Sequence, residues 1–195
     1  MSNIVYGMKD YLHSDDKKLI AWTLDGDSKA FGEIVRRYES MVASTIVNMI
    51  GNTQVAEDVG QDTFIRLYKS LSEFRGDSKL STYIHRIAIN LSLNELKKKK
   101  RLVSLFIKNE NSPQNTEIDI PDKGSGSEER NDLKEILELA INKLPVEFKS
   151  VVVLRLVHGY STKETSEILE LPSGTVLSRL SRARDQLKKE INKLM

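Results

Sequence analysis

The 195-residue sequence contains no cysteine, only four prolines and a single tryptophan. The absence of cysteine excludes disulfides, thiolate metal sites and thiol nucleophiles. No run of about 18 apolar residues occurs, and the first residues lack a basic segment followed by an apolar one, so we expect neither a membrane span nor a secretion signal. Neither charge sign is in clear excess, because 30 Lys and Arg face 28 Asp and Glu. The absent signal and span lead us to expect a cytoplasmic protein. Because the charges nearly cancel, its partners are indicated by where the charges lie along the chain and not by the net charge.

Three stretches of helical periodicity predict an all-α amino-terminal half. Apolar side chains recur every three or four positions through residues 31–50, 55–74 and 83–96, as they do on amphipathic helices. Gly76 and its neighbours favour a turn after the second stretch. The third stretch runs into five consecutive Lys and Arg at 97–101. No alternation typical of β-strands competes with this interpretation.

The composition changes after residue 101. Segment 102–130 contains two prolines, a Gly-Ser-Gly-Ser sequence and few large apolar residues, so it buries too little surface to offset the entropy of ordering. Residues 109–135 carry eight acidic and three basic side chains. We expect a flexible acidic linker at 102–130 between two small all-α domains, at 15–101 and 131–195, with a tail at 1–14.

A helix-turn-helix is the strongest local prediction in the second domain. Ser161 and Glu164 have the spacing of a capping box, which marks a helix start, and that helix should end near Leu169. Pro172 then forces a short turn, because it disfavours helical geometry in the residue before it. Ser173 can cap the next helix. Two helices joined by three or four residues form the motif that places its second helix in the major groove of DNA.

The second helix of this motif is basic on its polar face. Six Lys and Arg outnumber two acids along it, as a phosphate-binding helix requires. From their positions early in the helix we assign Ser178 and Arg182 to base readout, and Thr175, Arg179 and Arg184 to phosphate contact. A solvated basic helix in an ordinary bundle is the alternative.

Two sets of motifs follow one another in a specific order. The first is AEDVGQDTF at 56–64, FRGDS at 74–78 and YIHRIAIN at 83–90. The second is Leu144-Pro145, GTV at 174–176 and SRLSRAR at 178–184. Together they resemble the extracytoplasmic-function group of bacterial sigma factors, the promoter-recognition subunits of RNA polymerase in the sigma-70 family. The resemblance covers most of the chain and implies binding to core RNA polymerase and promoter DNA, with an anti-sigma factor as a further partner, and no cofactor or metal.

The resemblance implies a role for each of three surfaces. The helix with the first motif would bind the polymerase clamp through Asp58, Gln61, Asp62, Phe64 and Arg66. The turn and helix that follow would hold the opened strand of the minus-ten element through Tyr83, His85, Arg86, Asn90, Lys97, Lys98 and Arg101. The helix-turn-helix would read the minus-thirty-five element through Arg155, Thr175, Leu177, Ser178, Arg179, Arg182 and Arg184.

Residue chemistry is consistent with these roles and leaves alternatives. Aromatic faces, an amide and a basic track are what capture of a single strand requires. Taken alone, however, the polar residues of 58–66 also fit a solvated helix face, and the aromatics of the next helix also fit a core.

Three positions depart from the pattern of the family. Tyr83 stands where many relatives carry Trp, which leaves a smaller stacking surface. Leu177 stands where relatives commonly have a cation. One contact to the minus-thirty-five element is therefore lost or becomes an apolar contact between Leu177 and a thymine methyl. Thr165 replaces a usually apolar residue and should loosen the packing of the first motif helix.

The sequence leaves two other functions as alternatives. An ordinary helix-turn-helix repressor or activator explains the second domain but not the first motif. An enzyme acting on nucleic acid needs a metal or acid-base constellation. Asp58 and Asp62 lie four apart on one helical face, beside Glu57, but no further ligands or phosphate-binding glycine loop accompany them.

Overall fold

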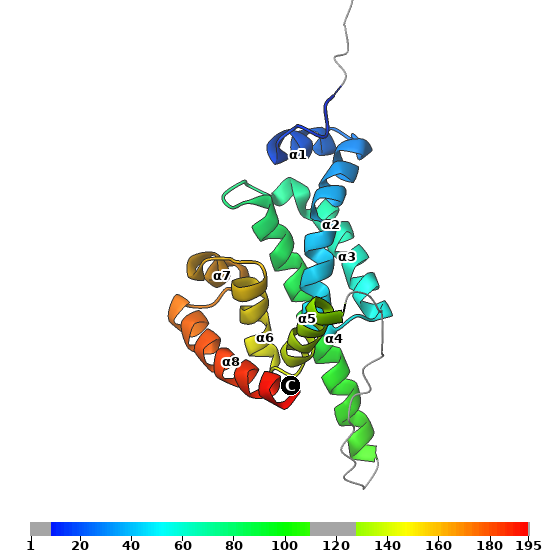
Figure 1. The fold of residues 1–195 in the computed structure, drawn as a ribbon. Helices are drawn as coiled ribbons and strands as arrows, with labels where there is room; N and C mark the ends of the chain where they lie inside the picture. Colours follow the sequence, from blue (N-terminus) through cyan, green and yellow to red (C-terminus); the bar gives the residue numbers. More distant parts are fainter. Residues whose placement is uncertain (1–8, 110–127, 195) are drawn as a thin grey trace, which may run out of the picture.

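The chain folds into helices throughout the part that the structure describes. The computed structural model describes the backbone of residues 9–109 and 128–194, and the side chains of 9–102 and 135–194. No β-strand occurs within these ranges, and the all-α prediction with two helical domains is confirmed. The elements are α1 (Asp16–Leu24), α2 (Ser28–Ile50), α3 (Gln54–Ser70), η1 (Leu71–Glu73), α4 (Leu80–Asn109), α5 (Glu128–Asn142), α6 (Val146–Val152), η2 (Val153–Val157), α7 (Thr162–Leu169) and α8 (Ser173–Leu194) (Figure 1).

Helices α1 to α4 form the amino-terminal bundle. The side chains of Asp15, Asp27 and Thr53 cap α1, α2 and α3 by accepting backbone N–H bonds, which satisfies donors left free at a helix start. Apolar side chains from all four helices form one core, whose fully enclosed members include Leu67 and Ile84. The periodicity predicted the faces that meet here, and burial of these faces stabilises the bundle.

A buried carboxylate on α2 positions an arginine that bonds to the segment before α1. Glu33 is buried, and it accepts bonds from Arg36 Nε and Nη2 at 2.8 Å and from Arg37 Nε at 2.9 Å. The Arg36 guanidinium, followed by that of Arg37, lowers the pKa of Glu33 to about 2. Arg37 also donates to the carbonyls of Tyr11 at 2.9 Å and Leu12 at 3.0 Å. The predicted tail at 1–14 is thus anchored from residue 9 onward, where Lys9 pairs with Asp27.

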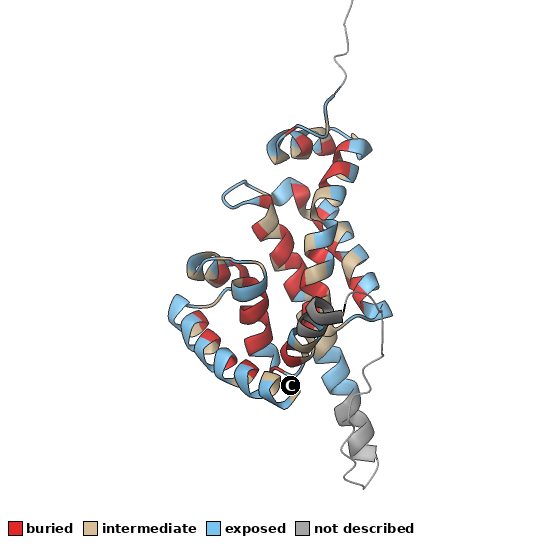
Figure 2. Ribbon diagram, in the orientation of Figure 1, coloured by how far each residue is buried: buried red, intermediate tan, exposed pale blue. Residues whose placement is uncertain are grey.

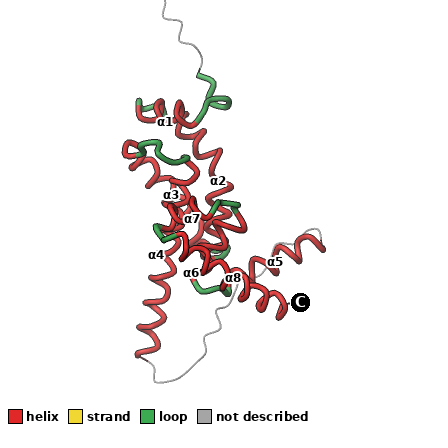
Figure 3. Tube along the Cα trace, turned by 90° about the vertical axis from the view of Figure 1, so that its left-hand side faces the viewer, coloured by secondary structure: helices red, strands yellow, loops and turns green. Residues whose placement is uncertain are grey.

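Helix α4 continues past the row of basic residues. It ends at Asn109, so the first residues of the predicted linker at 102–130 are helical. The far end of that segment is helical as well, because α5 begins at Glu128. The acidic centre, residues 110–127, lies outside the described residues. The end of α4 projects beyond both bundles, as the two views in Figures 1 and 3 show.

Helices α5 to α8 form the carboxy-terminal bundle. Its core combines residues of α5, α6 and α8, among them Ile141, Val152 and Leu187. The chain passes from α6 into one wide π-helical turn, η2, and then through a turn at Gly159, whose φ of 71° favours glycine.

The helix-turn-helix matches its prediction closely. Both bonds of the capping box are present, from Glu164 N to Ser161 Oγ at 3.2 Å and from Ser161 N to Glu164 Oε2 at 2.8 Å, and α7 ends at Leu169. Glu170 follows in the left-handed region at φ 54° and closes the helix. The predicted cap of α8 differs by one residue. Ser173 is already helical, and the carbonyl of Pro172 accepts the first backbone bonds of α8.

The two bundles share apolar packing. Met49 of α2 and Ile89 of α4 are fully buried and belong to the same apolar cluster as the core of the carboxy-terminal bundle. In Figure 2, buried residues occur along the part of α4 that lies next to α6 and α7. Burial of a large apolar side chain contributes about 2 kcal/mol to stability. Apolar burial therefore stabilises the contact between the two bundles, and we call the arrangement with this contact closed.

Thr165 provides a stability prediction. Its side chain is fully buried in α7, and its hydroxyl has no hydrogen-bond partner among the described residues. Thr165→Val keeps the shape and removes the unsatisfied hydroxyl, so we expect the free energy of unfolding to rise by about 1 kcal/mol in urea titrations. Thr63→Val is the matched control, because Thr63 is equally buried but its Oγ1 donates to the Val59 carbonyl at 2.7 Å. Equal stabilisation by both substitutions would contradict the explanation.

Candidate polymerase and nucleic-acid interfaces

The outer face of α3 carries the residues expected to bind core polymerase. Asp58, Gln61, Asp62 and Arg66 are all exposed, whereas Phe64 is half-buried and packs against the core of the amino-terminal bundle. Four of the five residues are therefore available on the surface. Phe64 instead supports the helix from inside.

Exposed apolar side chains lie on the same helix, and the sequence analysis did not single them out. Ile65 is 51% exposed and Tyr68 is 54% exposed. A hollow of about 450 Å³ runs between α3 and α4, and it is lined by Asp62, Ile65, Arg66, Lys69, Ser70, Glu73 and Leu91. Apolar groups surrounded by charges on a helix face are typical of a protein-binding surface. Ile65 and Tyr68 fall outside the apolar stripe predicted for 55–74, and this position off the buried face of α3 is the signal that could have indicated them.

Tyr83 faces the turn before α4. Its ring packs against Phe74 at 5.1 Å between centroids, and its hydroxyl donates to Ser70 Oγ at 2.9 Å. The ring is half-buried. These contacts hold the side chain at the start of α4, with part of its surface open.

His85 and Arg86 are occupied by the carboxy-terminal bundle. His85 is 1% exposed, and its ring lies edge-on to those of His158 and Tyr160 at centroid distances of 4.6 and 4.9 Å. Arg86 Nη2 donates to the Glu167 carbonyl at 2.8 Å, and Arg86 Nη1 lies 3.6 Å from Glu170 Oε1. In this arrangement His85 is closed to a DNA strand, whereas Arg86 keeps 39% of its side chain exposed but is engaged by the carboxy-terminal bundle.

The remaining residues expected at the minus-ten element lie further along α4. Asn90, Lys97, Lys98 and Arg101 are exposed, and Lys98 pairs with Glu95 within the helix. The structure therefore separates the predicted set into two groups. Asn90 and the basic row are accessible, whereas His85 is enclosed and Arg86 is engaged by contacts with Glu167 and Glu170.

The exposed face of α8 collects most residues expected at the minus-thirty-five element. Leu177, Ser178, Arg182 and Arg184 are exposed, and Thr175 and Arg179 are partly exposed. Leu177 is 53% exposed, and no other large apolar side chain in the described part of α8 is exposed. Ser178 Oγ donates to the Thr175 carbonyl at 3.0 Å, which holds it against its own helix.

Arg155 stands apart from the α8 face. It lies in η2, and its guanidinium donates to the Tyr160 carbonyl. Its Nε is buried without a partner among the described residues. The structure thus assigns Arg155 a contact that supports the turn before α7.

Lys149 is a buried charged residue that the sequence analysis missed. Its Nζ donates to the Asn142 carbonyl at 3.0 Å, and the side chain is buried in α6. Burial, followed by repulsion from Lys99 of α4, lowers the pKa of Lys149 to about 8. A lysine in the middle of an apolar helical stretch is the signal that could have indicated it.

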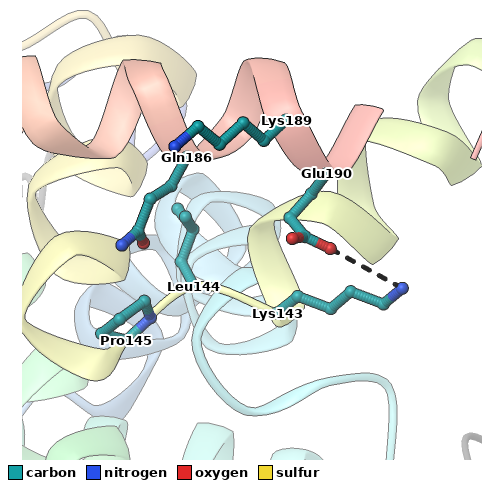
Figure 4. Close-up of a pocket in the computed structure, with 6 residues that line it drawn as sticks. All are labelled: Lys143, Leu144, Pro145, Gln186, Lys189 and Glu190. Carbon is teal, nitrogen blue, oxygen red and sulfur yellow. Dashed lines mark ion pairs between the residues drawn. The ribbon is translucent and has the colours of Figure 1, made fainter. Parts of the chain in front are cut away.

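A second hollow lies away from the residues predicted to contact DNA. It has a volume of about 370 Å³ and is formed by the turn after α5 and the last turns of α8 (Figure 4). Lys143 Nζ lies 3.9 Å from Glu190 Oε2 across it. None of the predicted site residues lines this hollow.

The described residues offer neither a metal site nor a membrane span. Within residues 9–102 and 135–194, no three acidic or histidine side chains are grouped to hold a metal ion, so Asp58 and Asp62 gain no third ligand there. No described helix has the length and apolarity needed to cross a bilayer.

Both halves of the chain match known protein families. Residues 34–102 match the family described as Sigma-70 region 2, and residues 134–187 match Sigma-70, region 4. The chain is 34% identical over 187 residues to the ECF RNA polymerase sigma-E factor of Haemophilus influenzae, covering 92% of this chain and 97% of the relative. It is also 34% identical over 193 residues to the ECF RNA polymerase sigma factor SigW of Bacillus subtilis, covering 91% of this chain and 97% of the relative.

Solved structures show the same fold. CnrH, in complex with the cytosolic domain of CnrY, aligns with a TM-score of 0.62 at 23% identity over 91% of this chain and 97% of that chain. The sigma factor RpoE of Bartonella quintana, in complex with the anti-sigma factor NepR, aligns with a TM-score of 0.62 at 21% identity over 84% of this chain and 98% of that chain. The motifs, the two helical bundles and these relatives lead to one assignment. The chain belongs to the extracytoplasmic-function sigma factors, which are transcription initiation factors of the sigma-70 family and not enzymes.

Proposed function

We propose that this protein directs core RNA polymerase to promoters by binding the enzyme through α3, the opened minus-ten strand through α4 and the minus-thirty-five duplex through α8. The two motif sets carry the proposal, because they place a protein-binding helix and a basic helix-turn-helix on one chain. We assign residues 15–101 to polymerase and minus-ten binding and 131–195 to minus-thirty-five binding, joined by 102–130. A cytoplasmic location follows from this function.

Binding to polymerase is assigned to Asp58, Gln61, Asp62 and Arg66, with Phe64 holding the helix in place. The exposed Ile65 and Tyr68 add apolar area beside these charges. A surface that combines an apolar centre with a charged rim provides both affinity and orientation for a protein partner.

Strand capture is assigned to α4. Tyr83 offers a stacking face, Asn90 an amide for a base edge, and Lys97, Lys98 and Arg101 a track for phosphates. His85 and Arg86 complete this set once the carboxy-terminal bundle moves away from them.

Duplex recognition is assigned to α8. Arg182 and Ser178 are placed for base readout, Leu177 for a thymine methyl, and Arg179 with Arg184 for phosphates. Thr175 contacts the backbone from the first turn. Arg155 contributes by supporting the turn that positions α7.

Two moderate contacts suffice when both are made on one polymerase. Linking two binding modules raises overall affinity by about 10²- to 10⁴-fold without new contacts. An anti-sigma factor is a proposed regulator, because CnrH and RpoE of Bartonella quintana were each solved with a bound partner protein and share this fold.

Transcription in vitro tests the proposal. Purified full-length protein is added to core RNA polymerase on genomic DNA of the source bacterium, and transcript starts are mapped. We expect new starts that share one sequence near position −10 and another near −35, and none with core enzyme alone. A repressor or activator of ordinary promoters would add no starts with core enzyme, and that result would contradict the proposal.

A further inference from the structure

Two histidines from different bundles are in contact where the amino-terminal and carboxy-terminal bundles pack together. His85 lies on α4 and His158 ends η2, with their ring centroids 4.6 Å apart. Tyr160 Oη lies 2.9 Å from His85 Nδ1, and His158 Nε2 lies 2.9 Å from Thr45 Oγ1 of α2. These contacts connect both long helices of the amino-terminal bundle to the segment before α7.

The hydrogen bonds suit neutral imidazoles. Thr45 Oγ1 donates to the Met41 carbonyl at 2.7 Å, so its lone pair accepts the N–H of His158 Nε2. His85 Nδ1 lies 3.0 Å from the Ser81 carbonyl, while His85 Nε2 is buried with no partner among the described residues. A second proton on His85 would therefore create a buried, unpaired donor, and it would bring a positive charge against His158.

We propose that His85 and His158 form an acid-sensitive latch, which holds the carboxy-terminal bundle over the DNA-facing side of α4 near neutral pH and weakens as both imidazoles become protonated. The consequence for promoter binding rests on the function proposed for α4. The latch itself rests on the contacts between the bundles.

The contacts of His85 and Arg86 show what closure restrains. His85 is enclosed, and the Arg86 guanidinium binds the carboxyl end of α7, where a cation is favoured by the exposed carbonyls. Opening of the latch would release both residues together, because α7 follows His158 and Tyr160 directly in the chain.

The surrounding charges do not replace the histidines as the sensor. Glu164 faces Tyr160 and Lys79, Glu170 pairs with Arg86, Arg155 binds the Tyr160 carbonyl, and Tyr38 of α2 faces Tyr160. Elsewhere in the interface Lys149 of α6 faces Lys99 of α4. With a pKa of about 8, Lys149 is mainly protonated from neutral pH downward and changes little in the acid range.

The sign of the pH effect follows from the closed state. Burial, followed by repulsion from His158, lowers the pKa of His85 from 6.5 to about 4, and burial also lowers the pKa of His158. Groups whose pKa is lowered by closure penalise closure as the pH falls below 6.5. From His85 alone, the closing equilibrium should weaken by about 20-fold between neutral pH and about pH 5, and His158 adds to this.

Energy transfer between two dyes measures closure directly. Because the chain has no cysteine, Ser40→Cys and Asp185→Cys introduce unique labelling sites on exposed positions of α2 and α8. The energy transfer is measured as the urea concentration is raised, once at about pH 7 and once at about pH 5. Opening is the loss of transfer that occurs at urea concentrations where the circular dichroism of the helices is still unchanged. We expect opening at lower urea at the lower pH, corresponding to a closing equilibrium that is weaker by about 20-fold or more.

Variants separate the latch from a general acid effect. His85→Phe with His158→Gln keeps a ring beside Tyr160 and a donor for Thr45 but cannot be protonated, so it should lose the pH dependence. His13→Gln is the matched control, because His13 is exposed and bonded only to Asp10 among the described residues, and it should retain the pH dependence.

Three results would overturn the latch. They are equal opening at both pH values in the parent, an unchanged response in the double variant, and an ordinary pKa for His85 in a nuclear magnetic resonance titration of the closed parent. The titration also decides the outcome if the double variant is open at every pH. If opening occurs but single-stranded promoter DNA binds no better, the role of α4 fails and the latch stands.

Discussion

Replacing Gln61 and Asp62 together by alanine is expected to weaken binding to core RNA polymerase by about 10- to 100-fold. Both side chains are exposed on α3, and Asp62 also lines the hollow beside Ile65. Desolvated residues near the centre of a protein interface contribute about 2 kcal/mol or more each to binding. Neither residue caps α3 or belongs to the core, so the fold should be retained.

The measurement is a titration of labelled protein with core enzyme, with circular dichroism as the check on folding. Glu39→Ala with Ser40→Ala is the matched control, because it removes one acid and one neutral polar group from neighbouring exposed positions of α2. Equal affinity of the parent and the Gln61/Asp62 variant would remove α3 from the polymerase interface.

Arg182→Ala is expected to weaken binding to the minus-thirty-five duplex by about 10- to 100-fold and to relax sequence preference at one base pair. A guanidinium that makes two bonds to one base contributes about 1–3 kcal/mol of discrimination. Arg182 is exposed on α8 and suits this role. Arg179→Ala should instead weaken binding to all sequences alike and reduce the slope of affinity against salt by about one unit, as the loss of one phosphate contact does.

Both variants are measured with the mapped promoter and with a duplex altered at the upstream element, over a range of salt. Lys143→Ala is the control, because it also removes one exposed cation but lies at the hollow near the far end of α8. If Arg182→Ala reduced affinity for the altered duplex as much as for the promoter, Arg182 would be a phosphate contact and not a reader of bases.

The acid-sensitive latch and the polymerase interface describe two states of one protein. Closure encloses His85 and engages Arg86, while the α3 face with Gln61 and Asp62 remains exposed. We therefore expect that core polymerase can engage α3 before the bundles separate. Full promoter contact then requires that the carboxy-terminal bundle leave α4.

The sequence by itself determined the helices, the capping box and the polar face of α8. These features depend on local rules, such as the spacing of apolar residues, the Ser161–Glu164 pair and the effect of Pro172 on the residue before it. It also indicated which residues are chemically suited to DNA, because guanidinium, amide and aromatic groups are recognisable without coordinates.

Only the tertiary structure decided which of these residues are accessible. His85 and Asn90 lie five positions apart on α4, yet one is enclosed and the other exposed, because α7 and the segment before it pack against one side of that helix. The contacts of His85 with His158 and Tyr160 span more than seventy residues. Such pairings depend on how two helical bundles dock, and the period of a single helix carries no information about its partner's orientation. For the same reason the sequence could identify Thr165 as unusual, but only the packing showed its hydroxyl to be buried without a partner in the described part of the chain.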